Sequence, residues 1–406
     1  MKSEDIIIIG GGASGLMAAV TAAMYAPQGT DILIIEHKSS VGKKLLATGN
    51  GRCNYTNDVL NDTCYRGNDP SFAYKIIEQY DKEWLLATLE SLGIVHTKIN
   101  GYYYPRSLQA STVVDHFVRR LESAGVRIHY STHVDSINVE NDGFTVYSSN
   151  GNYKTERIIV ATGGRSYEKL GSDGSGYQIL KRIGHNLIDT YPALTGIICE
   201  GLDFKLCHGV RAKGKLELYV NNRREAVSEG EIQFADYGIS GIPVFEISRY
   251  ASVALGNKSN IQVVCDLLPE YNINRLAEQM ISIVEQNPYT TAVELLASYL
   301  PLKLAKAILK MSGINGVDRV SVNELCAIIK NIKVFVKGTT GYDRAQVTAG
   351  GIDTSEISNE TMESKLFPGL YITGELLDID GTCGGYNLHF AFATGYVAGM
   401  SAALSL

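Results

Sequence analysis

Residues 6–36 read IIIIGGGASGLMAAVTAAMYAPQGTDILIIE, and this stretch decides the fold. The four isoleucines Ile6 to Ile9 are typical of a central parallel strand that is buried on both faces. Three glycines end this strand, a helix rich in alanine, methionine and leucine is predicted over residues 16–25, and residues 31–35 are apolar enough for the next strand. The order strand, glycine turn, helix and strand predicts a doubly wound α/β domain.

The glycines of this stretch have the spacing of a dinucleotide-binding turn. Gly10, Gly12 and Gly15 match G-x-G-x-x-G after a strand and at the opening of a helix, which is the setting of a Rossmann-like domain. Gly10 permits the tight turn, Gly12 lets the backbone approach a pyrophosphate, and Gly15 lets the helix pack closely on the strand.

Glu36 closes the second strand, 21 residues after Gly15, where a carboxylate would accept a hydrogen bond from a ribose hydroxyl. An acid at this distance argues against an ordinary glycine-rich turn. It also argues against a 2′-phosphate, which it would repel. Both NAD and FAD fit this motif, so the motif alone leaves the cofactor open.

The composition restricts the class of protein. A chain of 406 residues exceeds what one core usually supports, so two or three domains are expected. The net charge of −6 and the pI near 5.8 provide no basic field, and we expect no nucleic-acid partner. The N-terminal residues lack the features of a signal peptide, which predicts a cytoplasmic protein. Residues 390–406 are uncharged, but these 17 residues are too few for a membrane span, so we expect a buried helix and no membrane association.

Seven cysteines are scattered through the chain without a C-x-x-C pair. Their odd number and their spacing disfavour structural disulfides and zinc, and we predict no metal site. Most of them should be small buried hydrophobic residues. Cys53 and Cys383 stand out because each lies in a polar, glycine-rich stretch, although packing is the expected role there too.

The N-terminal half continues with a loop, helices and a meander. Residues 37–57 follow, and their core, residues 42–54, is too rich in glycine and basic residues for a regular element, so we predict a binding loop. Apolar residues at helical spacing predict helices within 71–92 and over 112–124. Residues 133–164 show strands separated by turn signals, as in an antiparallel meander, and end in a buried strand that runs into Ala161-Thr162-Gly163-Gly164. Glycines after an apolar strand indicate a backbone that passes close to a ligand.

The composition changes near Tyr191 and Pro192. From there to about residue 268 we predict mostly short strands, and residues 274–332 have helical runs separated by Pro288, Pro301 and Gly313. The predicted organisation is a discontinuous cofactor domain of residues 1–190 and 345–406, interrupted by a β-rich insert of residues 191–272 and 333–344 and by a helical subdomain of residues 273–332.

The last 60 residues carry a third glycine cluster. A predicted strand over residues 370–373 ends on Gly374 and Glu375, and glycines precede a predicted helix that begins near Asn387. A helix N-terminus stabilises negative charge, and the Glu375 carboxylate could hold a polyol. The chain therefore resembles the flavoproteins with two dinucleotide-binding domains. In these, FAD lies across a first glycine turn, an Ala-Thr-Gly strand end and a C-terminal Gly-Glu strand end. The resemblance predicts noncovalent FAD.

A narrower resemblance rests on longer motifs. These are GKKLLATGNGRCNYTN at residues 42–57, VTAGG at 347–351, TMESK at 361–365 and the segment 369–387. They are similar to the signatures of the BaiN-like family of bacterial FAD-dependent NAD(P)/FAD oxidoreductases, which includes aminoacetone oxidase. The resemblance implies an FAD-dependent oxidoreductase and is much less specific for the substrate, because the members of the family differ in activity.

The same resemblance implies where FAD is held. The glycine turn and Glu36 hold the ADP half, Val134 contacts the adenine through its backbone, and Glu375 binds the ribityl chain. The basic loop lines the flavin ring or its phosphates, and the start of the last helix lies on the far side. The implied cofactor-binding residues are Gly10, Gly12, Ala13, Ser14, Gly15, Glu36, His37, Lys43, Lys44, Gly51, Arg52, Cys53, Asn54, Val134, Ala161, Thr162, Gly163, Gly374, Glu375, Asp380, Tyr386, Asn387 and Leu388.

The reaction is less defined than the cofactor. No second G-x-G-x-x-G lies between the meander and the C-terminus, so a lasting nicotinamide site is not encoded. The flavin could be reduced by NAD(P)H that docks transiently, or by an amine-type substrate with reoxidation by oxygen. We expect a small-molecule substrate in a cleft between the domains, roofed by the insert. Catalytic residues are not identified: Tyr104, Arg106, Cys383 and His389 are polar candidates, each with a simpler structural interpretation.

Two other functions stay open on the sequence. One is an FAD-binding protein with a non-redox or tRNA-modifying role, because a tRNA-modifying flavoprotein shares the first motif; the acidic net charge speaks against it. The other is an NAD-dependent dehydrogenase. The sequence does not indicate the oligomeric state.

Overall fold

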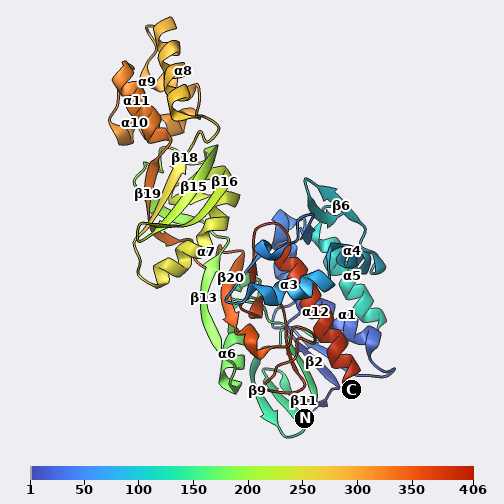
Figure 1. Ribbon diagram of the computed structural model, residues 1–406. Helices are drawn as coiled ribbons and strands as arrows, with labels where there is room; N and C mark the ends of the chain where they lie inside the picture. The colour runs from blue at the N-terminus through green and yellow to red at the C-terminus, as the bar shows by residue number, and fades with distance from the viewer. Residues whose placement is uncertain (1) are drawn as a thin grey trace. The chain divides into compact units, whose positions relative to one another are not determined.

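The computed structural model describes residues 2–406, and the chain divides into two compact units. Unit 1 comprises Met1–Thr190 and Val347–Leu406, and unit 2 comprises Tyr191–Gln346. Each unit has its own hydrophobic core. Elements from both ends of the chain, blue and red in Figure 1, therefore belong to unit 1.

Unit 1 is built on a five-stranded parallel sheet with the order β21-β12-β2-β3-β8. All four isoleucines of β2 are buried, and they pair in register with β3 on one side and β12 on the other. The predicted Rossmann-like α/β domain is thus confirmed, with the isoleucine run at the centre of the sheet. The strands are β2 (Ile6–Ile9), β3 (Ile32–Ile35), β8 (Arg127–His129), β12 (Arg157–Val160) and β21 (Leu370–Ile372).

A second sheet of unit 1, with the order β1-β11-β10-β9, contains the predicted antiparallel meander. The strand β11 was not identified separately in the sequence. Tyr153 and Thr155 are the buried residues of β11, so its apolar pattern is too short to be recognised without its partner β10. The strands are β1 (Lys2–Ser3), β9 (Val134–Glu140), β10 (Gly143–Ser148) and β11 (Gly151–Thr155).

Helices α1 (Ala13–Tyr25) and α12 (Tyr386–Leu404) lie side by side in unit 1 (Figure 1). Gly395 and Gly399 permit this close approach, because a Cβ at either position would lie 2.2 Å from the main-chain oxygen of Ser14 or Ala18. The predicted buried helix near the C-terminus is confirmed. Among residues 2–406, no helix has both the length and the apolar character needed to cross a bilayer.

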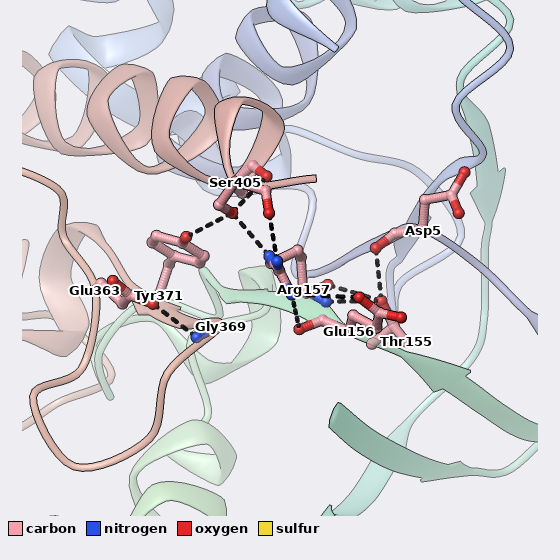
Figure 2. Close-up of polar contacts among 9 residues, drawn as sticks. Asp5, Thr155, Glu156, Arg157, Glu363, Gly369, Tyr371 and Ser405 are labelled. Atoms are coloured by element: carbon pink, nitrogen blue, oxygen red, sulfur yellow. Dashed lines mark hydrogen bonds and ion pairs between the residues drawn. The ribbon is translucent and has the colours of Figure 1, made fainter. Parts of the chain in front are cut away.

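Polar contacts tie the C-terminal end of α12 to the sheet (Figure 2). Arg157, at the start of β12, donates from Nε to the Ser405 hydroxyl over 2.7 Å and from Nη2 to the Ser405 main-chain oxygen. The Tyr371 hydroxyl in β21 lies 3.1 Å from the Ser405 hydroxyl oxygen. Because this end of α12 is fixed near the start of two parallel strands, the helix runs back along the sheet and begins toward the carboxyl ends of the strands.

The segment 37–57 contains a short helix, α2 (Lys43–Ala47), so the prediction that it lacks regular elements was wrong. These five residues are good helix formers, they follow Gly42 at a φ of +71°, and they bury Leu45. The other helices of unit 1 are α3 (Pro70–Gln79), α4 (Lys82–Ser91), α5 (Ala110–Ser123) and α6 (Ser175–Ile183). Small sheets pair β4 (Thr56–Asn57), β7 (Tyr102–Pro105) and β6 (His96–Ile99), then β22 (Asp380–Gly381) with β5 (Tyr65–Arg66), and β13 (Leu187–Ala193) with β20 (Val347–Ile352).

Unit 2 contains a closed barrel with the strand order β14-β17-β16-β15-β18-β19. The prediction of mostly short strands was wrong for β15 and β16, which form a long hairpin, and it missed helix α7 (Ile242–Gly256). The polar residues of β16 face solvent, which hides the strand in the sequence. The strands are β14 (Ile197–Glu200), β15 (Arg211–Val220), β16 (Arg223–Ala235), β17 (Gly238–Ser240), β18 (Ile261–Asp266) and β19 (Ile332–Thr339).

Four helices complete unit 2, and they share one core with the barrel. Met280 in α8 and Cys326 in α11 touch in this core, with 3.6 Å between their sulfur atoms. Pro288, Pro301 and Gly313 lie between helices, as the sequence predicted. The helices are α8 (Ile273–Gln286), α9 (Ala292–Ala297), α10 (Leu302–Ser312) and α11 (Arg319–Ile329).

Candidate functional site

The first glycine turn leaves room at only one of its three motif positions. Gly10 has a φ of +101°, and a Cβ there would lie 2.5 Å from the main-chain oxygen of Ala161. A Cβ on Gly15 would lie 1.9 Å from the main-chain oxygen of Gly10. A Cβ on Gly12 would meet nothing within 4 Å. The turn therefore brings the ends of β2 and β12 together and leaves open space in front of the N-terminus of α1, where Ala13 and Ser14 stand.

Two backbone N–H groups hold the carboxylate of Glu36. Gly11 donates to Oε2 over 2.8 Å, and Lys38 donates to Oε1 over 2.7 Å. Glu36 is only 7% exposed, so its orientation is fixed before any ligand arrives. Each carboxylate oxygen can accept a further hydrogen bond, which suits a pair of ribose hydroxyls.

His37 and Val134 lie beside Glu36. The main-chain oxygen of Glu36 accepts from Thr132 over 3.0 Å, which places the start of β9 against the end of β3. Burial lowers the pKa of His37, although Glu36 and Asp173 oppose that shift. The neutral imidazole and the buried Val134 give this corner the mixed apolar and polar character that an adenosine requires.

The end of β12 lies against the first glycine turn. Ala161 donates to the main-chain oxygen of Ile9 over 2.8 Å, and Gly163 has a φ of +75°. The Thr162 hydroxyl is buried without a hydrogen-bond partner among residues 2–406. Because an unpartnered buried hydroxyl is costly, this position is suited to a ligand that supplies the missing partner.

An ion pair joins two segments that are remote in the sequence. Lys44 Nζ in α2 lies 2.6 Å from Glu375 Oε2, and both side chains are about one-fifth exposed, at 22% and 18%. Thr348 fixes the other oxygen, since its main-chain N–H donates to Glu375 Oε1 over 3.0 Å. Thr348 was not among the predicted site residues, although the VTAGG motif around it was noticed. Lys43, in contrast, turns to Ser39, with 3.1 Å between Nζ and Oγ.

The loop after α2 is a chain of unusual backbone conformations. Gly51 has a φ of +81° and Cys53 a φ of +61°. Cys53 is fully buried, and burial raises the pKa of its thiol to about 12, so it acts as a packing residue. Arg52 is exposed. Asn54 Oδ1 is buried without a partner among residues 2–406 and lies 2.8 Å from the position that a Cβ on Gly385 would take.

The C-terminal glycine cluster contacts the first glycine segment at the start of α1. A Cβ on Gly374 would lie 2.8 Å from the Ser14 hydroxyl, so the third glycine segment meets the start of α1. Asn387 bridges the turn before α12: its Oδ1 accepts from the N–H of Gly381 over 2.8 Å, and its Nδ2 donates to the oxygen of Gly381 over 3.0 Å. Tyr386 packs edge-on against Tyr65. Asp380, which precedes this turn, is buried, and Leu388 packs at the edge of the core.

Taken together, the described residues offer the groups that an extended dinucleotide needs. The carboxylates of Glu36 and Glu375 are each held by a backbone N–H group and could accept hydroxyl groups, and there is open space at Gly12. The unpartnered oxygens of Thr162 and Asn54 mark two places where a ligand would complete the hydrogen bonding. Lys43, Cys53 and Leu388 are predicted site residues that make contacts within the protein, Lys43 with Ser39 and the other two with the core. No group of residues in the described chain is arranged to hold a metal ion.

The four polar candidates for catalysis differ in environment. His389 is completely buried; its Nε2 donates to the main-chain oxygen of Tyr80 and its Nδ1 accepts from the Thr56 hydroxyl, each over 2.8 Å. Burial lowers the pKa of His389 to about 4, so this neutral residue is structural. Arg106 is exposed and follows β7. Tyr104 and Cys383 are half-buried and influence each other electrostatically.

Cys383 is the one cysteine that is not buried, and all seven belong to the described residues. Treatment of the native protein with iodoacetamide is expected to label one thiol, because the other six are inaccessible and burial raises, for example, the pKa of Cys265 to about 12. Peptide mass spectrometry locates the label, and Cys383→Ser should abolish it. Rapid labelling of Cys53 in the folded protein would contradict the buried position of that residue.

The chain is similar to proteins of known family over nearly its whole length. The family model described as the HI0933-like protein Rossmann domain matches residues 4–401. A 3-dehydro-bile acid delta(4,6)-reductase from Clostridium scindens is 38% identical over 402 residues, covering 98% of both chains. A ribosomal RNA dihydrouridine synthase from Escherichia coli is 28% identical over 404 residues, covering 98% of this chain and 97% of that one. Among solved structures, the 3-ketosteroid-delta4-(5alpha)-dehydrogenase from Rhodococcus jostii RHA1 gives a TM-score of 0.52 at 14% identity, covering 99% and 97% of the two chains, which is a likeness of fold.

Proposed function

The chain belongs to the HI0933-like family of Rossmann-domain proteins and is an FAD-dependent oxidoreductase, and from this premise we propose that it reduces a carbon–carbon double bond conjugated with a carbonyl group. The observation that carries the proposal is the 38% identity to a delta(4,6)-reductase over 98% of both chains. A reductase named for these positions of a 3-dehydro bile acid saturates double bonds in conjugation with a ketone. A small, largely apolar molecule with such a group is therefore the proposed substrate.

We assign the cofactor to the residues described above. The N–H groups around Gly12 and Gly163 would hold the pyrophosphate, and Glu36 would bind the adenosine ribose, with His37 and Val134 beside the adenine. Glu375, held by Lys44 and Thr348, would bind the ribityl chain. Asn54 and the turn before α12 would meet the flavin ring. The bound FAD supplies hydride transfer.

The chain's own residues prepare this site before the cofactor binds. The carboxylates of Glu36 and Glu375 are already held by N–H groups or by Lys44, so little side-chain entropy is lost when hydroxyls dock on them. The N-terminus of α12, with the Asn387 bridge in front of it, would favour negative charge on the nearby ring. We propose NAD(P)H as an electron donor that docks transiently, since no second glycine motif is present in the sequence.

A second substrate class has specific support. The relative from Escherichia coli is named a ribosomal RNA dihydrouridine synthase and matches 98% of this chain at 28% identity. Dihydrouridine arises when the C5–C6 double bond of uracil, which is conjugated with a carbonyl, is saturated. The two named activities thus share one chemistry. The higher identity to the bile-acid reductase favours the small molecule.

An anaerobic experiment tests the proposal. The purified protein should be yellow and release FAD on denaturation, and NADH or NADPH should bleach the flavin. A 3-oxo-Δ4 or 3-oxo-Δ4,6 steroid should then restore the yellow colour faster than air does, with one saturated double bond per flavin, as mass spectrometry would show.

The same reduced enzyme separates the alternatives. Reoxidation by uridine-containing ribosomal RNA, with no response to steroids, would transfer the proposal to RNA. Rapid peroxide formation with an amine substrate, and no turnover of any conjugated ketone, would instead establish an oxidase and overturn the proposed reduction.

A further inference from the structure

Strand β7 presents three consecutive tyrosines, and their hydroxyl groups have different surroundings. Tyr103 is buried and donates to Asp58 Oδ1 over 2.8 Å. Tyr104 lies on the opposite face of the strand, and its main-chain oxygen accepts from the Tyr55 hydroxyl over 2.9 Å. This bond and the pairing of β7 with β4 and β6 fix the backbone of Tyr104.

The Tyr104 hydroxyl itself has no hydrogen-bond partner among residues 2–406, although the side chain is half-buried. Burial raises its pKa, so the phenol stays protonated at neutral pH and can donate a hydrogen bond. Such a donor on a fixed backbone is available to a partner from outside the chain.

Arg52, which is exposed and lies in the loop that packs on the Tyr104 ring, provides a second donor. Within the described chain its guanidinium makes no ion pair and no hydrogen bond, whereas its positive charge acts on Tyr104 and opposes the rise of the phenol pKa. The loop before Arg52 packs on the tyrosine ring, since a Cβ on Gly49 would lie 3.7 Å from Tyr104 Cε1. Main-chain bonds from Arg52 to Gly49 and from Cys53 to Thr48 hold the loop, at 3.2 and 3.0 Å.

The two donors lie beside the segments assigned to the flavin ring. Cys383, which precedes the glycines before α12, is one of the groups that act on Tyr104. Asn54, two residues after Arg52, carries the unpartnered oxygen next to Gly385. The pair therefore lies at the flavin end of the proposed site, where the reaction would occur. Glu36 belongs to the opposite end, which is assigned to the adenosine.

We propose that Arg52 and Tyr104 bind the carbonyl oxygen of the substrate and stabilise the negative charge that develops there during reduction. The proposal rests on the proposed function and adds the group of the substrate that is recognised. A guanidinium only donates hydrogen bonds, and a neutral phenol can donate its O–H proton, so together they match a carbonyl oxygen that becomes an enolate.

The electron balance of the step is complete. A hydride, which carries two electrons, adds to the β-carbon of the conjugated system and forms a new C–H bond. The electron pair of the double bond shifts toward the carbonyl, and its oxygen, held by Arg52 and Tyr104, takes the negative charge. The α-carbon then takes a proton from solvent, the carbonyl is restored, and NAD(P)H is the reductant that supplies the hydride to the cofactor.

Infrared spectroscopy of a bound ligand tests the carbonyl contact without turnover. A 13C=O-labelled 3-oxo-Δ4 steroid, 4-androstene-3,17-dione, is bound to the oxidised FAD-loaded protein, where no reaction occurs. The carbonyl stretch should move to lower frequency in the wild type, and this shift should shrink in Tyr104→Phe and in Arg52→Met. Tyr103→Phe, which removes a hydroxyl bonded to Asp58 on the same strand, serves as the matched control and should behave like the wild type.

Kinetics provide the second readout. In both variants kcat/KM for the steroid should fall by about 100- to 1,000-fold, the usual effect of removing one donor to a developing oxyanion. In Tyr104→Phe the rate of flavin reduction by NAD(P)H and the FAD content should stay within about twofold of the wild type, which shows that this variant is folded and loaded. For Arg52→Met, kcat/KM is expressed per bound FAD, because Arg52 is also one of the implied cofactor-binding residues.

The outcomes separate the two proposals. If the wild type shifts the carbonyl frequency and the two variants do so equally, the assignment of Arg52 and Tyr104 is wrong while the proposed function stands. If the wild type, once reduced, neither binds nor reduces any conjugated ketone, the proposed function fails and this assignment fails with it.

Discussion

Gly12→Ala should strip FAD from the protein while leaving its fold intact. Gly12 has a φ of −81°, which alanine adopts readily, and a Cβ there meets no atom of the chain within 4 Å. The added methyl group would occupy the open space assigned to the pyrophosphate and hold it away from the N–H groups of the turn. Losing two charge-assisted hydrogen bonds costs about 3 kcal/mol or more, which is roughly a 100-fold weaker binding of FAD.

Gly15→Ala is the matched comparison for this prediction. Its Cβ would lie 1.9 Å from the main-chain oxygen of Gly10, so both the fold and the cofactor should suffer, by about 1–3 kcal/mol in stability. Thermal unfolding of the two apoproteins and fluorescence titration with FAD distinguish the variants. A Gly12→Ala protein that retains FAD as tightly as the wild type would show that the pyrophosphate does not lie at this turn.

Replacing Gly395 and Gly399 together by alanine should destabilise unit 1 by about 2–4 kcal/mol. Helix propensity alone would favour each alanine by about 1 kcal/mol. Each new Cβ, however, would lie 2.2 Å from a main-chain oxygen of α1, that of Ser14 or of Ala18, and this overlap forces the helices apart. Because α1 begins at the assigned pyrophosphate site, FAD content should fall together with stability.

Differential scanning calorimetry of the apoprotein measures the effect, which corresponds to a decrease in Tm of about 5–15 °C. Ser401→Ala on the same helix is the control, since Ser401 is half-buried and the change should alter stability by no more than about 0.5 kcal/mol. A double variant with a Tm equal to or above that of the wild type would contradict the close packing of α1 and α12.

Local patterns in the sequence were sufficient to predict the secondary structure at the centre of unit 1. The isoleucine run, the three glycines and Glu36 predicted β2, the turn, α1 and β3 within a few residues, because each of these features depends on neighbours in the chain. The buried C-terminal helix was predicted for the same reason: its apolar composition has no other stable environment in water.

Unit 2 shows where local patterns were insufficient. Closure of the barrel depends on pairing between β14 and β19, which are more than 100 residues apart, and no local pattern encodes that contact. In β16, residues with charged side chains alternate along the solvent-facing side, so the strand resembles a loop in the sequence. Helix α2 was missed because five helix-forming residues are too few to stand out between glycines.

Residue types in the candidate site were easier to predict than their partners. The sequence indicated Glu36 and Glu375 because each follows an apolar strand at a glycine motif. The ion pair between Lys44 and Glu375 and the contribution of Thr348 required the three-dimensional fold, since these contacts span 331 and 27 residues. The proximity of the Arg52 loop to Tyr104 also required the three-dimensional fold, because it depends on the pairing of β7 with β4.

The packing of α12 on α1 also determines when unit 1 can complete its folding during translation. Gly395 meets Ser14, and 381 residues separate them, so α1 waits for its partner for about 20–80 s at ribosomal rates of about 5–20 residues per second. Unit 2 is continuous in the chain and can fold during this interval. The apolar face of α1 that α12 later covers stays open until the chain is nearly finished. Unfinished chains are therefore expected to be sensitive to proteases and to bind chaperones for most of the synthesis.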